Sequence, residues 1–203
     1  MISIINYGMG NVGSVLNMFK RIGVQANIVN TSEEILKAEK ILLPGVGAFG
    51  NAMNLIDEKG FRNALHVKAL EEKIPMLGIC LGMQLLTNGS EENKGIAGLG
   101  LIDADTIKFD LEDKELKIPH MGWNCIFGSK ENEFIKNLPD NPKYYFVHSY
   151  HVRCNNLNDE LAYCNYGKPF TAMVQKDNIY GAQFHPEKSH KYGMKLLQNF
   201  ANL

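Results

Sequence analysis

The sequence has few of the features that mark secreted, membrane-bound or nucleic-acid-binding proteins. Its four cysteines form no C-x-x-C pair, which disfavours zinc and disulfide frameworks. No apolar run reaches the ~20 residues of a membrane-spanning helix, and no basic leader precedes the first apolar segment. A formal net charge of −1 offers no basic surface. We therefore expect a cytoplasmic protein with reduced thiols and with neither a nucleic acid nor a membrane as partner.

Metal ligands are also sparse. The six histidines are scattered along the chain. His148 and His151 are close in sequence, but they lie in a strand-like run, where residues three apart point to opposite sides. We therefore predict no metal site, and nothing in the sequence indicates an organic cofactor.

Apolar residues, in contrast, make up 45% of the 203 residues, which suits a single domain spanning residues 1–203. In the first half, predicted strands alternate with predicted helices. The strands are expected at 2–6, 25–29, 40–43 and 75–79, and the helices at 12–22, from 31, between the turn at 44–47 and residue 72, and from 81. This alternation predicts an α/β fold with a mainly parallel central sheet and helices on both faces.

The second half contains short β-rich runs at close spacing. They cover 101–109, 116–118, 144–152, 161–164, 170–175 and 179–184, and a last helix is expected at about 189–200. These runs predict an antiparallel β extension of the sheet.

The segment Gly-Met-Gly-Asn-Val-Gly at 8–13 follows an apolar run and fits G-x-G-x-x-G, the fingerprint of dinucleotide-binding folds. Such a site also needs an acidic residue at the end of the second strand to hold the ribose. Asn30 stands at that place. We interpret the glycines as a tight strand-to-helix turn and keep a nucleotide-binding module as an alternative.

A second glycine-flanked segment indicates a catalytic nucleophile. Gly78-Ile79-Cys80-Leu81-Gly82 lies between a predicted strand and a predicted helix, which is the G-x-nucleophile-x-G pattern with cysteine in place of serine. The glycines allow a strained turn, and the helix that follows favours the thiolate. The amide of Leu81 would then bind an oxyanion.

A thiolate nucleophile needs a base, and Gln183-Phe184-His185-Pro186-Glu187 supplies one. Pro186 disfavours a helical His185, and in an extended chain residues 185 and 187 point to the same side. The carboxylate can then hold the imidazole in one tautomer. Cys80, His185 and Glu187 therefore predict a Cys-His-Glu catalytic triad.

These two segments resemble those of class I (triad) glutamine amidotransferases. Nearly the whole chain is similar to the glutaminase subunits of imidazole glycerol phosphate synthase. Four further segments carry this resemblance: Tyr7–Asn11, Leu43–Phe49, Pro119–Asn124 and Tyr145–Tyr150. The resemblance implies the three-layer fold of that class and a glutaminase reaction. In that reaction Cys80 attacks the side-chain amide of L-glutamine, ammonia leaves with a proton from His185, and water hydrolyses the glutamyl thioester.

The resemblance also implies roles for residues around the triad. Val46 and Gly47 would join Leu81 in the oxyanion hole. The peptide that supplies this second amide is implied to turn when a partner is engaged, and glycine allows such a turn because it tolerates either sign of φ. The implied glutamine pocket consists of Gly45, Gln84, His148, Ser149 and Tyr150.

The implied partner is a (β/α)8-barrel cyclase subunit that forms a heterodimer with the glutaminase. It would use the ammonia to close the imidazole ring of an intermediate in histidine and purine synthesis. The residues that match this interface are Tyr7, Asn11, Pro119, Trp123, Asn124 and Lys188. Trp123, the single tryptophan, suits an interface anchor and a core residue equally.

Other features leave the ammonia acceptor open. Asn6 stands where many family members carry aspartate, and His151 where they carry a second tyrosine. The segments 148–154 and 187–194 look more like a paralogous group that serves bacterial surface-sugar pathways, where the ammonia makes an amidino group on a sugar. A stand-alone cysteine hydrolase, such as a peptidase or γ-glutamyl hydrolase, is a third interpretation. The sequence has no insertion able to form a separate substrate lid, which counts against it.

Overall fold

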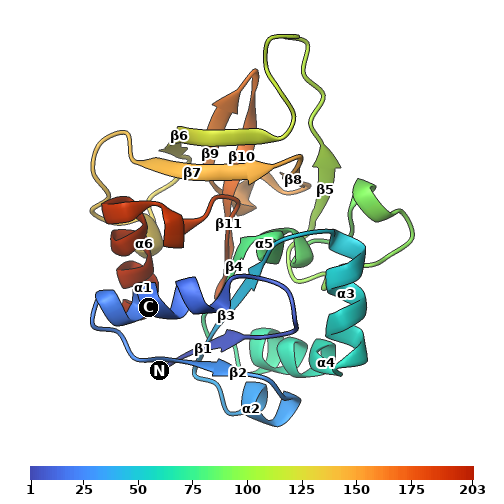
Figure 1. The fold of residues 1–203 in the computed structure, drawn as a ribbon, viewed down its shortest axis with the longest axis vertical. Helices are drawn as coiled ribbons and strands as arrows, with labels where there is room; N and C mark the ends of the chain where they lie inside the picture. Colours follow the sequence, from blue (N-terminus) through green and yellow to red (C-terminus); the bar gives the residue numbers. More distant parts are fainter.

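The computed structural model describes residues 1–203, and the chain is built around one mixed β-sheet (Figure 1). Its parallel half consists of β2 (Ala26–Val29), β1 (Ile2–Ile5), β3 (Lys40–Gly45), β4 (Met76–Cys80) and β11 (Ile179–Ala182), in that spatial order. All four pairings within this half are parallel. The predicted parallel sheet is confirmed, with β3 two residues longer than expected.

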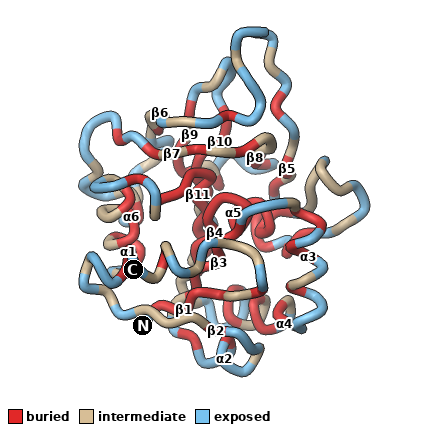
Figure 2. The backbone as a smooth tube through the Cα atoms, viewed as in Figure 1, coloured by how far each residue is buried: buried red, intermediate tan, exposed pale blue.

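Helices cover both faces of this half and separate two apolar cores. One face carries α1 (Val12–Arg21) and α6 (His190–Asn202); the other carries α2 (Ser32–Leu36), α3 (Phe49–Glu58), α4 (Phe61–His66), the π-helical turn η1 (Val67–Glu71) and α5 (Leu81–Leu85). Adjacent strand residues point into different cores: Ile4 joins Phe19 and Phe200, whereas Ile5 joins Phe49. Figure 2 shows the buried strands between these helical layers.

The antiparallel half begins where β10 (Lys168–Lys176) pairs with β11. The sheet continues through β9 (Glu160–Tyr166) and β6 (His120–Gly128) to β7 (Lys143–His148), while β8 (Tyr150–Cys154) pairs with β10 and β5 (Ala104–Lys108). Short 3-10 turns lie at η2 (Glu91–Asn93), η3 (Glu133–Ile135), η4 (Leu157–Asp159) and η5 (Pro186–Lys188). The predicted antiparallel extension is confirmed.

Three details of the second half differ from the sequence prediction. Residues 116–118 form no strand and lie in a mostly exposed connection between β5 and β6. β6 itself was not predicted, because it is half-exposed and lacks a clean alternation of apolar residues. The expected strand at 144–152 is interrupted at Ser149, which divides it into β7 and β8.

This interruption overturns the geometric argument about His148 and His151. The two rings do not face opposite sides: both lie against Phe109, with ring centroids at 5.2 and 4.7 Å. No group of three or more His, Cys, Asp or Glu side chains is arranged to hold a metal ion. None of the helices has the length and apolar character needed to cross a membrane.

The corner between β4 and α5 has no room for side chains at its two glycines. A Cβ on Gly82 would lie 1.9 Å from the carbonyl oxygen of Leu43, and one on Gly78 would lie 2.6 Å from that of Gly82. A positive φ occurs at Cys80 itself, with φ 53° and ψ −111°, outside the allowed regions for a residue with a side chain. The glycines thus provide space for the turn, and the strained conformation belongs to the cysteine between them.

We expect Gly82→Ala to lower the free energy of unfolding by about 3 kcal/mol, because the added methyl group must displace strand backbone. Urea denaturation followed by circular dichroism measures this loss. The matched control is Gly13→Ala inside α1, where the nearest atom lies 4.0 Å from the new Cβ. There alanine should leave stability unchanged or raise it by up to about 1 kcal/mol. Equal stabilities for the two variants would contradict the steric argument.

Candidate active site

Four neighbouring parallel strands end at the same edge of the sheet. β1 leads into the loop at 6–11, β3 into Val46 and Gly47, β4 ends at Cys80, and β11 leads into the segment 183–188. Open α/β sheets bind ligands at this edge, outside the carboxyl ends of their strands. The topology therefore brings the separate predicted motifs to one place.

The predicted triad residues come together here. His185 Nδ1 donates to Glu187 Oε1 at 2.8 Å, and both side chains are almost completely buried. The His185–Glu187 pair was predicted from an extended chain, and that geometry is wrong. The chain does not stay extended after His185: Pro186–Lys188 form a 3-10 turn, and this turn returns Glu187 to the imidazole.

The charges around His185 favour its protonated form. Burial alone lowers the pKa of an imidazole, but the interactions of His185 with Cys80 and Glu187 raise its pKa to about 9. His185 Nε2 forms no hydrogen bond within the chain and is available for proton transfer. The arrangement can therefore hold an imidazolium next to the sulfur at neutral pH.

A cavity of about 370 Å³ opens beside Cys80, large enough for an amino acid. Most residues predicted for the oxyanion hole and the glutamine pocket line it: Val46, Gly47, Leu81, Gln84, His148, Ser149 and Tyr150. Gly45 does not line the cavity. It is buried at the end of β3, where a Cβ would lie 2.6 Å from the Tyr7 hydroxyl.

Two residues of this cavity, Glu92 and Val147, were not predicted from the sequence. Glu92 provides the only carboxylate in the lining, and its Oε2 accepts a hydrogen bond from the amide of Phe49 at 2.8 Å. It lies in η2, which no local pattern connects with the other motifs. Its place next to Cys80 results from tertiary packing against the start of α3.

Two groups of backbone amides belong to residues that line the cavity beside Cys80. Leu81 begins α5, directly after Cys80. The amides of Val46 and Gly47 take part in no backbone hydrogen bond, and Gly47 has φ +103°. Because α5 spans only five residues, its dipole contributes less to thiolate stabilisation than the sequence analysis assumed.

The glycine-rich loop after β1 supports the end of β3. Tyr7 is fully buried, and its hydroxyl donates to the carbonyl of Pro44 at 2.9 Å. Its prediction as a partner-contacting residue is therefore wrong. Gly8 and Gly10 have positive φ, as a tight turn requires, whereas Gly13 lies inside α1. A Cβ on Gly10 would meet the Pro44–Gly45 peptide at 3.4 Å.

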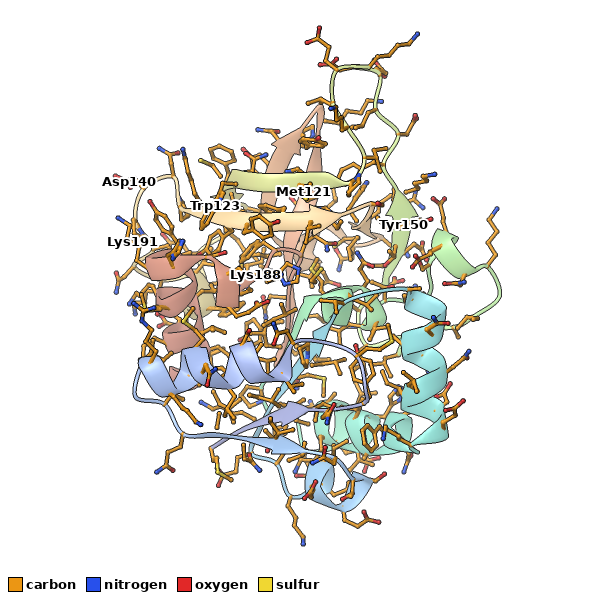
Figure 3. The ribbon with its side chains drawn as sticks, viewed as in Figure 1. Met121, Trp123, Asp140, Tyr150, Lys188 and Lys191 are labelled. Carbon is orange, nitrogen blue, oxygen red and sulfur yellow. The ribbon has the colours of Figure 1, made fainter.

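The other predicted interface residues are exposed or half-buried. Trp123 is 46% exposed, which excludes the core alternative, and its ring stacks on His190 with centroids 5.4 Å apart. Figure 3 shows Trp123 and Met121 along β6, with Lys188 below them. Pro119 and Lys188 line the cavity. Asn124 donates to the carbonyl of Asn165, and the Asn11 side chain caps α1.

Comparisons with known proteins agree with this geometry. The sequence profile of the family described as "Glutamine amidotransferase class-I" matches residues 3–203, so the chain is an enzyme of this class. A solved structure described as "Crystal structure of glutamine amidotransferase" shares the fold, with a TM-score of 0.76, 17% identity, and coverage of 100% of this chain and 99% of that one.

More similar relatives show to which family of glutamine amidotransferases the chain belongs. The chain is 54% identical, over 98% of both chains, to "Imidazole glycerol phosphate synthase subunit HisH 2" of Methanococcus maripaludis. It is 45% identical, over 100% of both chains, to a protein of the same name from Pseudomonas aeruginosa. The chain therefore belongs to the HisH family, as its motifs predicted.

The His185 pKa can be measured directly by NMR titration of histidine-labelled protein. We expect His185 to titrate at about pH 9. The imidazolium persists below that pH, because Cys80 and Glu187 stabilise the charged form. Glu187→Gln removes one of these charges and should lower the pKa of His185 by about one unit or more.

Two other histidines serve as internal references in the same spectra. Burial lowers the pKa of His120 to about 4 and that of His148 to about 3. Neither should titrate near neutral pH, in the wild type or in the variant. A His185 pKa that stays the same in Glu187→Gln would contradict the electrostatic role of the carboxylate.

Proposed function

We propose that this protein is the glutaminase subunit of an imidazole glycerol phosphate synthase in histidine biosynthesis, with Cys80, His185 and Glu187 as its triad. The observation that carries the proposal is the buried His185–Glu187 pair beside Cys80, at the mouth of a cavity sized for an amino acid. Membership in the HisH family supports the same reaction and directs the ammonia to a partner subunit.

The first half of the reaction forms a thioester. The Cys80 thiol proton passes to His185 Nε2, and the sulfur attacks the side-chain amide carbon of L-glutamine. The amide of Leu81, with that of Val46 or Gly47, stabilises the tetrahedral oxyanion. The carbon–nitrogen bond then breaks, and the imidazolium returns its proton to the departing ammonia.

The second half regenerates the enzyme. His185 takes a proton from a water molecule, which attacks the glutamyl thioester, and the sulfur leaves as a thiolate. Glutamate dissociates and leaves the Cys80 thiolate beside the His185 imidazolium, ready for the next substrate. Glu187 holds the imidazole through both halves and stabilises its charged form, as the carboxylate of such triads does.

Glu92 gives the cavity a second recognition point. L-Glutamine carries an α-ammonium group at the end opposite to its reacting amide, and a buried ammonium requires an anionic or polar partner. Glu92 is the only carboxylate in the lining. We therefore assign Glu92 to the α-ammonium group, which orients the amide toward Cys80.

The partner would dock on an apolar surface around the cavity mouth. Four of the exposed large apolar side chains, Val46, Ile118, Met121 and Trp123, belong to segments that line or adjoin the cavity. Exposed aromatic and methionine side chains are enriched in interfaces. A (β/α)8 cyclase subunit bound here in a heterodimer would receive ammonia directly and would touch Val46, next to the oxyanion peptide.

A second acceptor is supported by the names of the relatives. Those from M. maripaludis and P. aeruginosa are both numbered "HisH 2", which indicates more than one such subunit in each organism. A duplicated glutaminase can serve a separate pathway, and a synthase that makes an amidino group on a surface sugar is the alternative. The glutaminase chemistry is the same for both acceptors.

Glutamate release from glutamine, titrated with the cyclase subunit of the same organism and its ribonucleotide substrate, tests the proposal. We expect stimulation that saturates at equal amounts of the two subunits. Cys80→Ser should reduce the rate by about a thousandfold or more, because a hydroxyl is a far weaker nucleophile here. Cys125→Ser, a half-buried cysteine outside the cavity, is the control and should keep full activity.

The outcomes separate the two acceptors. If the cyclase gives no stimulation but an amide-reactive glutamine analogue labels Cys80, the protein is still a glutaminase. Its ammonia acceptor is then assigned to the surface-sugar pathway. Preferential turnover of peptides or γ-glutamyl chains would instead indicate a stand-alone hydrolase. Tight binding of NAD or ATP with an unreactive Cys80 would indicate a nucleotide-binding module.

The role of Glu92 has its own test. Glu92→Gln should raise KM for glutamine by about tenfold or more, because the neutral amide loses the charge-assisted contact, and should leave kcat within about threefold. The neighbouring Glu91→Gln is the matched control, since Glu91 lies outside the cavity and accepts from the amide of Lys108. Equal KM values for the two variants would refute the assignment.

A further inference from the structure

The carboxamide of Gln183 lies next to the reactive sulfur. Gln183 follows β11 by one residue and is completely buried, with its backbone amide bonded to the carbonyl of Ala172. Its side-chain Nε2 donates to Cys80 Sγ at 3.9 Å. This amide is the only side-chain group that forms a hydrogen bond with that sulfur.

The orientation of this amide follows from its other contact. Gln84 Nε2 donates to Gln183 Oε1 at 3.1 Å and to the carbonyl of Tyr150 at 3.0 Å. Because Gln183 presents its oxygen to Gln84, its NH₂ group must face Cys80. A reversed amide would place two NH₂ groups against each other and an oxygen against the sulfur.

Two neutral histidines extend the chain of hydrogen bonds. His148 Nδ1 lies 2.8 Å from the carbonyl of Tyr150 and therefore carries a proton. Burial keeps both rings neutral at pH 7, so His148 Nε2 must accept, and His120 Nδ1 donates to it at 3.1 Å. His148 Nδ1 and Gln84 Nε2 both donate to the carbonyl of Tyr150, which fixes the orientation of each side chain. The branch through Gln84 and Gln183 ends with an N–H directed at Cys80.

We propose that Gln183 is a further catalytic residue, whose carboxamide N–H stabilises the Cys80 thiolate. This rests on the proposed function, because it concerns the same nucleophile. When the thiol proton moves to His185 Nε2, negative charge develops on the sulfur, and the N–H contact becomes charge-assisted. No bond to Gln183 forms or breaks. In the thioester the sulfur is neutral and the contact weakens, so Gln183 also favours departure of the thiolate during hydrolysis.

A purely structural role would have a different signature. In that case the only role of Gln183 would be to accept a hydrogen bond from the buried amide of Gln84. Gln183→Glu keeps an oxygen for Gln84 and would then resemble the wild type, whereas Gln183→Met, which offers no acceptor, would be the more damaging change. A donor to the sulfur predicts the opposite order, because glutamate adds negative charge beside the thiolate and methionine does not.

The experiment measures the rate at which iodoacetamide alkylates Cys80, by mass spectrometry, across about pH 5 to 9. We expect Gln183→Met to slow alkylation near neutral pH by about tenfold, and Gln183→Glu to slow it further. The pH midpoint of alkylation should rise in both variants. In the complex with the partner, kcat for glutamine hydrolysis should fall, with KM within about threefold of the wild type.

Three controls accompany this measurement. Cys154 and Cys164 are internal references, because burial raises the pKa of each thiol to about 12. Gln175→Met replaces a glutamine on β10 outside the cavity, which donates to the carbonyl of Asp177, and should leave alkylation of Cys80 unchanged. Circular dichroism identifies variants that fold. If the methionine variant fails to fold, the comparison of Gln183→Glu with the wild type still shows whether Gln183 stabilises the thiolate.

The possible failures are distinguishable. If wild-type Cys80 is alkylated no faster than Cys154, the proposed function fails and Gln183 has no thiolate to stabilise. If wild-type Cys80 is reactive but folded Gln183→Glu reacts within about twofold of it, only the assignment of Gln183 is overturned.

Discussion

The close approach of the β4–α5 corner to β3 is the constraint on which the site depends. Gly82 has no space for a side chain because the carbonyl of Leu43 occupies it. This contact holds Cys80 in a strained positive-φ conformation that a non-glycine residue rarely adopts alone. The same contact sets the end of β3 beside the start of α5, so the Val46–Gly47 peptide and the Leu81 amide lie near one sulfur.

Burial has opposite consequences for the histidines around this corner. Burial lowers the pKa of His120 and His148, because their partners are neutral. His185 is also buried, yet its pKa is raised, since it lies between Cys80 and Glu187. The site therefore combines one imidazole able to carry charge with two that act as oriented neutral donors. Neutral His148 therefore adds no positive charge to the cavity lining near Cys80.

The loop after β1 connects the catalytic edge with the outer surface. Tyr7 binds the carbonyl of Pro44 from inside, while Asn11, four residues later, is exposed at the start of α1. Val46 lies on the surface and directly follows β3. A protein that covered Asn11 and Val46 would therefore contact the backbone on both sides of the end of β3, next to the cavity at Cys80.

The sequence alone determined the features that have a local cause. The alternation of apolar runs predicted the parallel strands, and the glycine-flanked Cys80 predicted the elbow, because both patterns depend on neighbouring residues. Only the tertiary structure decided the rest. It moved Tyr7 from the expected interface into the core, split the strand at Ser149, and brought Glu92 and Gln183 into the site. These outcomes depend on packing and hydrogen bonds between segments distant in the chain, which leave no periodicity or spacing in the sequence.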